Sequence, residues 1–150
     1  MGIGLHEILI VIFLALLALI TASDIKDKKI PNQYIIVVFG LGIVAAIFIP
    51  ELALWERAVG FFVVSAPLFL INMMVPGAFG GGDIKLMAVS GLYLGVELII
   101  LSFFIGAICG GIYGIWLLVK GKGRKEEFPL GPFLCGGMFI AIVANLILRQ

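Results

Sequence analysis

Two aspartates of this chain sit at the ends of apolar runs, where acidic side chains are uncommon. Asp24 follows the run 5–22 in the stretch TASDIKDKKIPN, and Asp83 follows three glycines in PGAFGGGDIKLM. Ionisable groups at membrane depth are costly and usually serve a function. Two carboxylates at matching depth on different helices suit aspartyl chemistry. The ionised member takes a proton from water and the protonated member polarises a carbonyl.

Each aspartate also has a plainer interpretation. Asp83 suits a helix N-cap, because a carboxylate there satisfies free N–H groups and the helix dipole. Asp24 suits a solvated charge beside three lysines, and Asp27 is its rival one turn further on. A phosphate-binding loop is disfavoured at Asp83, because no GK[ST] follows the glycines.

The composition predicts that lipid surrounds most of the chain. Of 150 residues, 63% are hydrophobic and 13% charged, and the mean hydropathy is +1.26; a soluble chain of this length would expose the excess apolar surface. The net charge of +1 and the lack of basic blocks do not suggest a nucleic-acid partner. Cys109 and Cys135 lie inside apolar runs and suggest neither a disulfide nor a metal site. No metal or cofactor is expected.

Six apolar runs predict an all-α polytopic bundle of about six transmembrane helices, forming one domain over residues 1–150. The runs are 5–22, 34–49, 58–75, 86–96, 98–119 and 133–148, and the boundary near Gly95 is the weakest. With six spans, most basic residues fall on one side: Lys26, Lys28, Lys29, Lys85, Lys120, Lys122, Arg124 and Lys125. Only Arg57 and Arg149 fall on the other. The positive-inside rule then makes the first side cytoplasmic, with both termini outside.

Three motifs in the same order resemble the type IV prepilin peptidases, a family of GxGD intramembrane aspartyl proteases. SDIKDKKIPN looks like their first-aspartate motif, GGGDIKLM like their GxGD motif, and FPLGPFL, residues 128–134, like the segment that opens their last helix. The resemblance covers nearly the whole chain. It implies a peptidase of the cell membrane that removes the short basic leader from type IV pilin-like or archaeal flagellin-like precursors at the cytoplasmic face.

The resemblance also implies roles for single residues. Asp24 and Asp83 would be catalytic, and the residues that shape the motifs would be Pro31, Asn32, Gly80, Gly82, Gly131 and Pro132. Lys85 is a candidate to contact the substrate or to influence the charge of the aspartates, although snorkelling to the interface is the favoured explanation. Larger bacterial members carry an N-terminal region with paired cysteines that is associated with N-methylation. This chain has no such motif, so methyltransferase activity is not expected.

Two other classes of function remain open at this point. A small ion- or proton-coupled transporter would use Asp83 as a proton carrier. A purely structural membrane subunit would tolerate loss of both acids. The absence of a visible inverted repeat and the position of both aspartates toward one face favour the peptidase.

Overall fold

A computed structural model of the chain describes residues 2–121 and 129–150. The described residues form helices and no strands, which confirms the all-α prediction. The helices are α1 (Leu5–Asp27), α2 (Asn32–Phe48), α3 (Leu54–Val63), α4 (Ser65–Met74), α5 (Gly81–Leu94), α6 (Val96–Val119) and α7 (Gly131–Leu148). Three of the basic residues assigned to the cytoplasmic side and the first residue of the FPLGPFL motif lie outside the described residues. They are Lys122, Arg124, Lys125 and Phe128.

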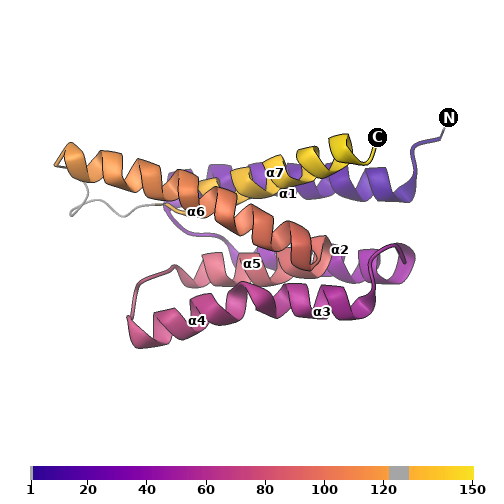
Figure 1. Ribbon diagram of the computed structural model, residues 1–150, viewed down its shortest axis with the longest axis horizontal. Coiled ribbons are helices and arrows are strands. Elements are labelled where there is room, and N and C mark those ends of the chain that lie inside the picture. The colour runs from indigo at the N-terminus through magenta and orange to yellow at the C-terminus, as the bar shows by residue number, and fades with distance from the viewer. Residues whose placement is uncertain (1, 122–128) are drawn as a thin grey trace.

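The helices run back and forth as an elongated bundle (Figure 1). Both termini lie at one end, here called the terminal end. The connections after α1, α4 and α6 lie at the other, here called the lysine-bearing end. Within the described ranges, four segments are long and apolar enough to span a bilayer: α1, α3 with α4, α6 and α7. The described helices are therefore consistent with a polytopic membrane bundle.

The helices α3 and α4 make one rod with an irregularity at Val64. Pro67 explains the irregularity. Its ring clashes with the carbonyl of the residue four positions earlier, Val63, and it has no N–H to donate. The Ser65 hydroxyl donates to the Phe61 carbonyl, which satisfies one of the backbone acceptors near the irregularity.

Gly95 separates α5 from α6 and confirms the weakest predicted boundary. Its φ of 84° lies in a region that favours glycine. A Cβ at this position would also lie 2.6 Å from Leu52 Cδ2. The chain therefore reverses at Gly95, and α5 has only 14 residues.

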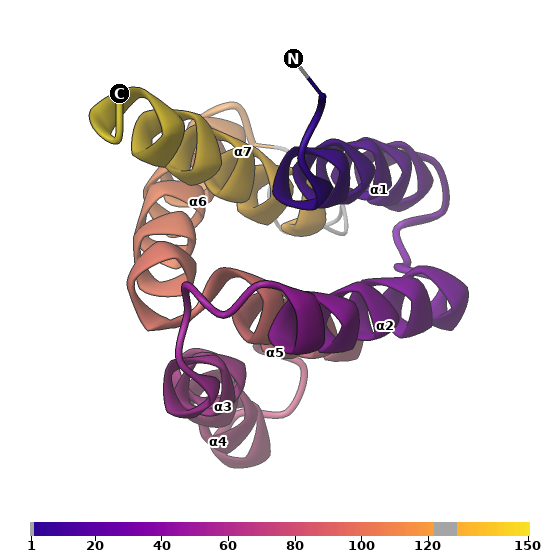
Figure 2. The ribbon, with the colours of Figure 1, turned by 90° about the vertical axis from the view of Figure 1, so that its right-hand side faces the viewer.

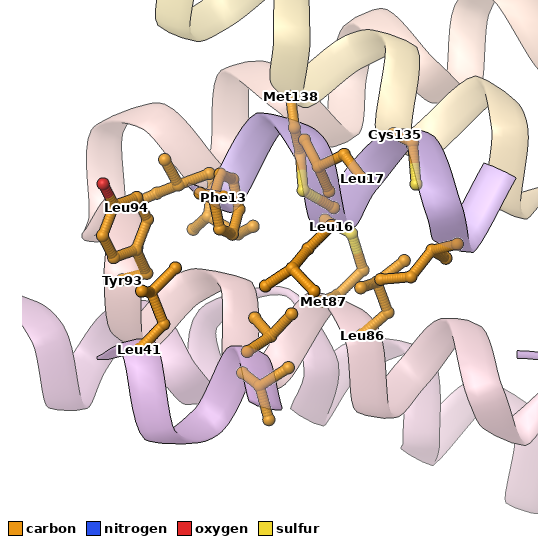
Figure 3. Close-up of a cluster of buried hydrophobic side chains, with 14 of the residues drawn as sticks. Phe13, Leu16, Leu17, Leu41, Leu86, Met87, Tyr93, Leu94, Cys135 and Met138 are labelled. Atoms are coloured by element: carbon orange, nitrogen blue, oxygen red, sulfur yellow. The ribbon is translucent and has the colours of Figure 1, made fainter. Parts of the chain in front are cut away.

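Large apolar side chains from several helices meet in one core. Seen end-on, α1, α2, α5, α6 and α7 are arranged around it, with the α3–α4 rod beside α5 (Figure 2). Figure 3 shows side chains such as Phe13, Met87 and Met138 converging there, and these three are fully buried. Many other large apolar side chains point outward, for example Ile36, Phe62 and Ile112, each more than 60% exposed. An outward apolar surface of this kind fits lipid as the surrounding solvent.

Glycines let two pairs of helices touch backbone to backbone. A Cβ on Gly60 of α3 would lie 2.5 Å from the Gly91 carbonyl of α5, and a Cβ on Gly91 would collide with Gly60. Gly106 of α6 and Gly137 of α7 make a similar crossing. Helices in lipid gain little from apolar burial against one another, so close packing at small residues holds them together.

Arg57, expected in a connecting loop, lies instead inside α3 and is only 2% exposed. Its guanidinium donates to four carbonyls, those of Ala45, Ile49, Leu92 and Tyr93. These carbonyls lie at the C-terminal ends of α2 and α5, where many backbone acceptors lack helical partners, although the Ala45 carbonyl also accepts from the Ile49 N–H. Arg57 therefore joins α2, α3 and α5 at the terminal end.

Replacing Gly91 with Ala should destabilise the bundle, because the new methyl group overlaps the Gly60 backbone. Overpacking of this kind costs about 1–3 kcal/mol, so the thermal unfolding midpoint in detergent should fall. Gly40→Ala is the matched control, since a Cβ at Gly40 meets nothing within 4 Å. Equal midpoints for the two variants would refute the close α3–α5 crossing.

Candidate active site

Both predicted catalytic aspartates line one cleft at the lysine-bearing end of the bundle. The cleft has a volume of about 300 Å³. Its walls come from the end of α1, the start of α2 and the start of α5. The lining residues are Asp24, Lys28, Lys29, Ile30, Asn32, Gly80, Gly81, Gly82 and Asp83.

Asp24 belongs to α1, which continues past the apolar run through Asp27. The residue is 5% exposed, and within the described part of the chain its Oδ2 is buried without a hydrogen-bond partner. Helix α1 ends at Lys28, whose φ of 54° turns the chain back and whose N–H donates to the Asp24 carbonyl over 2.8 Å. Asp27 is exposed and does not line the cleft. The two candidates for the first acid thus differ in burial, and Asp24 is the one that lines the cleft together with Asp83.

The first turn of α7 lies directly against the Asp24 carboxylate. A Cβ on Gly131 would collide with Asp24, with Cγ only 2.9 Å away. Pro132 follows in the first turn, where a missing N–H costs nothing and the fixed φ favours helix initiation. The Gly-Pro pair therefore starts α7 and lets it approach the acid.

Asp83 is the third residue of α5, and the N-cap position is held by Gly80. The N-cap interpretation of Asp83 is therefore wrong, although an acid in the first turn still suits the helix dipole. Helix α6 extends beyond the start of α5 at this end (Figure 1), so the start of α5, whose first turn contains Asp83, is recessed from the end of the bundle. Its side chain is half-buried.

The three glycines before Asp83 have different surroundings. A Cβ on Gly80 would lie 3.1 Å from Asp83 Oδ2, and one on Gly82 would lie 3.1 Å from Ile30 Cβ. A Cβ on Gly81 would meet nothing within 4 Å. The two positions singled out by the GxGD pattern are the crowded ones.

Several residues that shape the cleft were not predicted from the sequence. Ile30 packs against Gly82. Asn72 accepts a hydrogen bond from the Phe79 N–H over 3.3 Å, which restrains the loop before Gly80.

The other predicted site residues lie at the start of α2 and in α5. Pro31 is the N-cap of α2 and Asn32 its first residue. Lys85 is exposed and does not line the cleft. The lysines that line the cleft are Lys28 and Lys29.

The carboxyl groups of Asp24 and Asp83 belong to residues that line the same cleft. Close carboxylates titrate as a pair, which favours one protonated and one ionised member. Among residues 2–121 and 129–150, no group of three or more His, Cys, Asp or Glu side chains is placed to hold a metal ion. Two acids that line one cleft are the residue types that activation of a water molecule requires.

Comparison with known proteins agrees with this arrangement. Residues 11–115 match the model of the type IV leader peptidase family. The chain belongs to the type IV leader peptidase family. The match includes both aspartates of the cleft and all of the other residues that line it.

Three relatives show how much of this chain, and of each relative, the sequence similarity covers. The prepilin leader peptidase/N-methyltransferase of Bacillus subtilis is 33% identical over 93% of this chain and 57% of its own length. The protein of the same name from Xanthomonas campestris is 28% identical over 89% of this chain and 48% of its own. That of Legionella pneumophila is 42% identical over 42% of this chain and 22% of its own.

The chain spans about half the length of the first two relatives. No solved structure matches it significantly.

Replacing Gly131 with Ala should destabilise the protein, because the added methyl group displaces either Asp24 or the start of α7. We expect a loss of about 1–3 kcal/mol, seen as a lower thermal midpoint in detergent. Gly136→Ala in the same helix is the control, since a Cβ there meets nothing within 4 Å. If both variants unfold at the wild-type temperature, α7 does not contact Asp24 as described.

Proposed function

We propose that residues 1–150 form a membrane peptidase unit that removes the short leader from type IV pilin-like precursors by aspartyl chemistry. The observation that carries the proposal is the convergence of Asp24 and Asp83, 59 positions apart in sequence, in one cleft. Membership of the type IV leader peptidase family supports the substrate class. Relatives named prepilin leader peptidase support it further.

In the proposed mechanism, the two carboxylates hold a water molecule between them. The ionised aspartate takes a proton from this water as the oxygen attacks the scissile carbonyl carbon. The protonated aspartate donates a hydrogen bond to the carbonyl oxygen, where negative charge develops. The tetrahedral intermediate then collapses, the peptide C–N bond breaks, and the leaving nitrogen takes a proton from the dyad.

The position of the cleft supports cleavage near a membrane face. It lies at one end of the bundle rather than midway along it, and α5 starts recessed from that end. A precursor whose leader ends where its apolar helix begins would present its scissile bond at this depth. A proton carrier near the midplane, as the transporter alternative requires, has less support from this geometry.

The distribution of charge supports placing the cleft toward the cytoplasm. Lys28, Lys29, Lys85 and Lys120 all lie at the lysine-bearing end. Basic residues near span ends are retained on the cytoplasmic side. We therefore propose a multi-pass protein of the cell membrane with a cytoplasmic active site and both termini outside.

Asp24→Asn and Asp83→Asn should each abolish leader removal, because an amide cannot exchange the proton that the mechanism requires. Loss of a positioned acid or base lowers the rate by about 10²-fold or more. The measurement is the processed fraction of a co-expressed type IV prepilin in membranes containing equal amounts of each variant.

Asp27→Asn is the matched control, because Asp27 carries the same charge, lies one helical turn after Asp24 and is exposed. It should leave processing unchanged. Processing that survives Asp24→Asn or Asp83→Asn would rule out the dyad. Loss of processing in Asp27→Asn alone would move the first acid to that position.

Fusions to a reporter that is active only outside the cytoplasm test the proposed orientation. A reporter joined after Gln150 should be active, and one inserted after Gly121, at the lysine-bearing end, should be inactive. The reverse result would place the cleft on the outer face.

A further inference from the structure

Asn72 is a polar residue near the C-terminal end of the apolar helix α4, which reads SAPLFLINMM. Its neighbours Met73 and Met74 are exposed, whereas Asn72 is half-buried. An amide side chain in apolar surroundings is costly unless it is hydrogen-bonded. The partner of Asn72 therefore indicates what the residue does.

The partner of Asn72 lies in the connection between α4 and α5. Asn72 Oδ1 accepts a hydrogen bond from the Phe79 N–H over 3.3 Å. The exposed part of this connection, residues 75–78, turns at Gly77, whose φ is 83°. The Phe79 side chain is partly buried and packs against the core. The end of the connection is thus held from two sides, by the Asn72 amide and by the core.

The residue after Phe79 touches the second aspartate of the cleft. Gly80 is the N-cap of α5, and its carbonyl accepts from the Ile84 N–H over 3.2 Å. A Cβ on Gly80 would lie 3.1 Å from Asp83 Oδ2, so the Gly80 backbone lies against the Asp83 side chain. A shift of the Phe79–Gly80 backbone would therefore change the space that the Asp83 carboxyl group occupies.

We propose that Asn72 is a positioning residue for Asp83. It holds the Phe79 N–H and, through the Gly80 backbone, the side chain of the acid. Asn72 does not line the cleft, so it acts through the backbone rather than on the substrate. This role rests on the proposed function, in which Asp83 takes part in cleavage. A displacement of about 1 Å in an active site can lower a rate about 10²-fold.

Three variants of the full chain, purified in non-ionic detergent, test this role. Asn72→Leu removes the acceptor, and Asn72→Asp keeps an oxygen acceptor on a side chain of the same shape. Asn145→Leu is the matched control, because Asn145 is also half-buried but lies in α7 at the terminal end.

Two quantities are measured for each variant. The first is amide hydrogen exchange in a peptide spanning residues 75–80, which needs no cleavage and reports local opening. The second is the pair kcat and KM for a purified type IV prepilin, well below the thermal midpoint of each variant. A residue that only stabilises the fold would leave kcat of the folded protein unchanged.

Asn72→Leu should speed exchange in residues 75–80 several-fold, because a hydrogen bond of the connection is lost. Its kcat should fall about tenfold or more. Its KM should change little, because the walls of the cleft from α1 and α2 are unaltered. Asn72→Asp and Asn145→Leu should stay close to the wild type in exchange, kcat and KM.

Unchanged exchange in Asn72→Leu would overturn the proposal, since Asn72 would then not hold Phe79. Faster exchange with an unchanged kcat would overturn it too, because the contact would restrain the loop without positioning the acid. An equal loss of kcat in Asn145→Leu would have the same consequence. A wild type that cleaves no prepilin would instead refute the proposed function, and the exchange result would still decide whether Asn72 holds Phe79.

Discussion

The contact between the Asp24 carboxylate and the backbone of Gly131 is the constraint on which the site depends. It requires α7 to begin without a side chain at that point, and α1 to remain helical beyond its apolar run. Asp24 is consequently buried and held by two helices. Asp83 lines the same cleft from α5, at whose start Gly80 and Gly82 have crowded surroundings. A pair of acids held this way needs little reorganisation when charge develops on a substrate.

The scaffold around this contact relies on close backbone approach more than on apolar burial. Gly60 with Gly91, and Gly106 with Gly137, bring α3 against α5 and α6 against α7. At the other end of the bundle, Arg57 satisfies carbonyls that the ends of α2 and α5 leave free. In a bilayer no water replaces these hydrogen bonds, so this buried arginine stabilises the fold.

The sequence predicted the helical segments well, because long apolar runs and their basic flanks are strong local signals. It also indicated the two aspartates and the Gly-Pro pair, whose residue types are unusual where they occur. It did not indicate the burial of Arg57, the contact of Ile30 with Gly82, or the open surroundings of Gly81. These features depend on which helices pack together, and no local pattern encodes that. The N-cap alternative for Asp83 failed because α5 begins two residues before the acid, with Gly80 as its N-cap.

Cross-linking tests most directly whether the two acids face one cleft. Cysteines would replace Asp24 and Asp83 in a chain with Cys109 and Cys135 changed to serine, and membranes would be treated with a short bifunctional thiol reagent. The account predicts an intramolecular cross-link for this pair and none for cysteines at Asp27 and Asp83. Two cysteines that each react with a monofunctional reagent but never cross-link would contradict it.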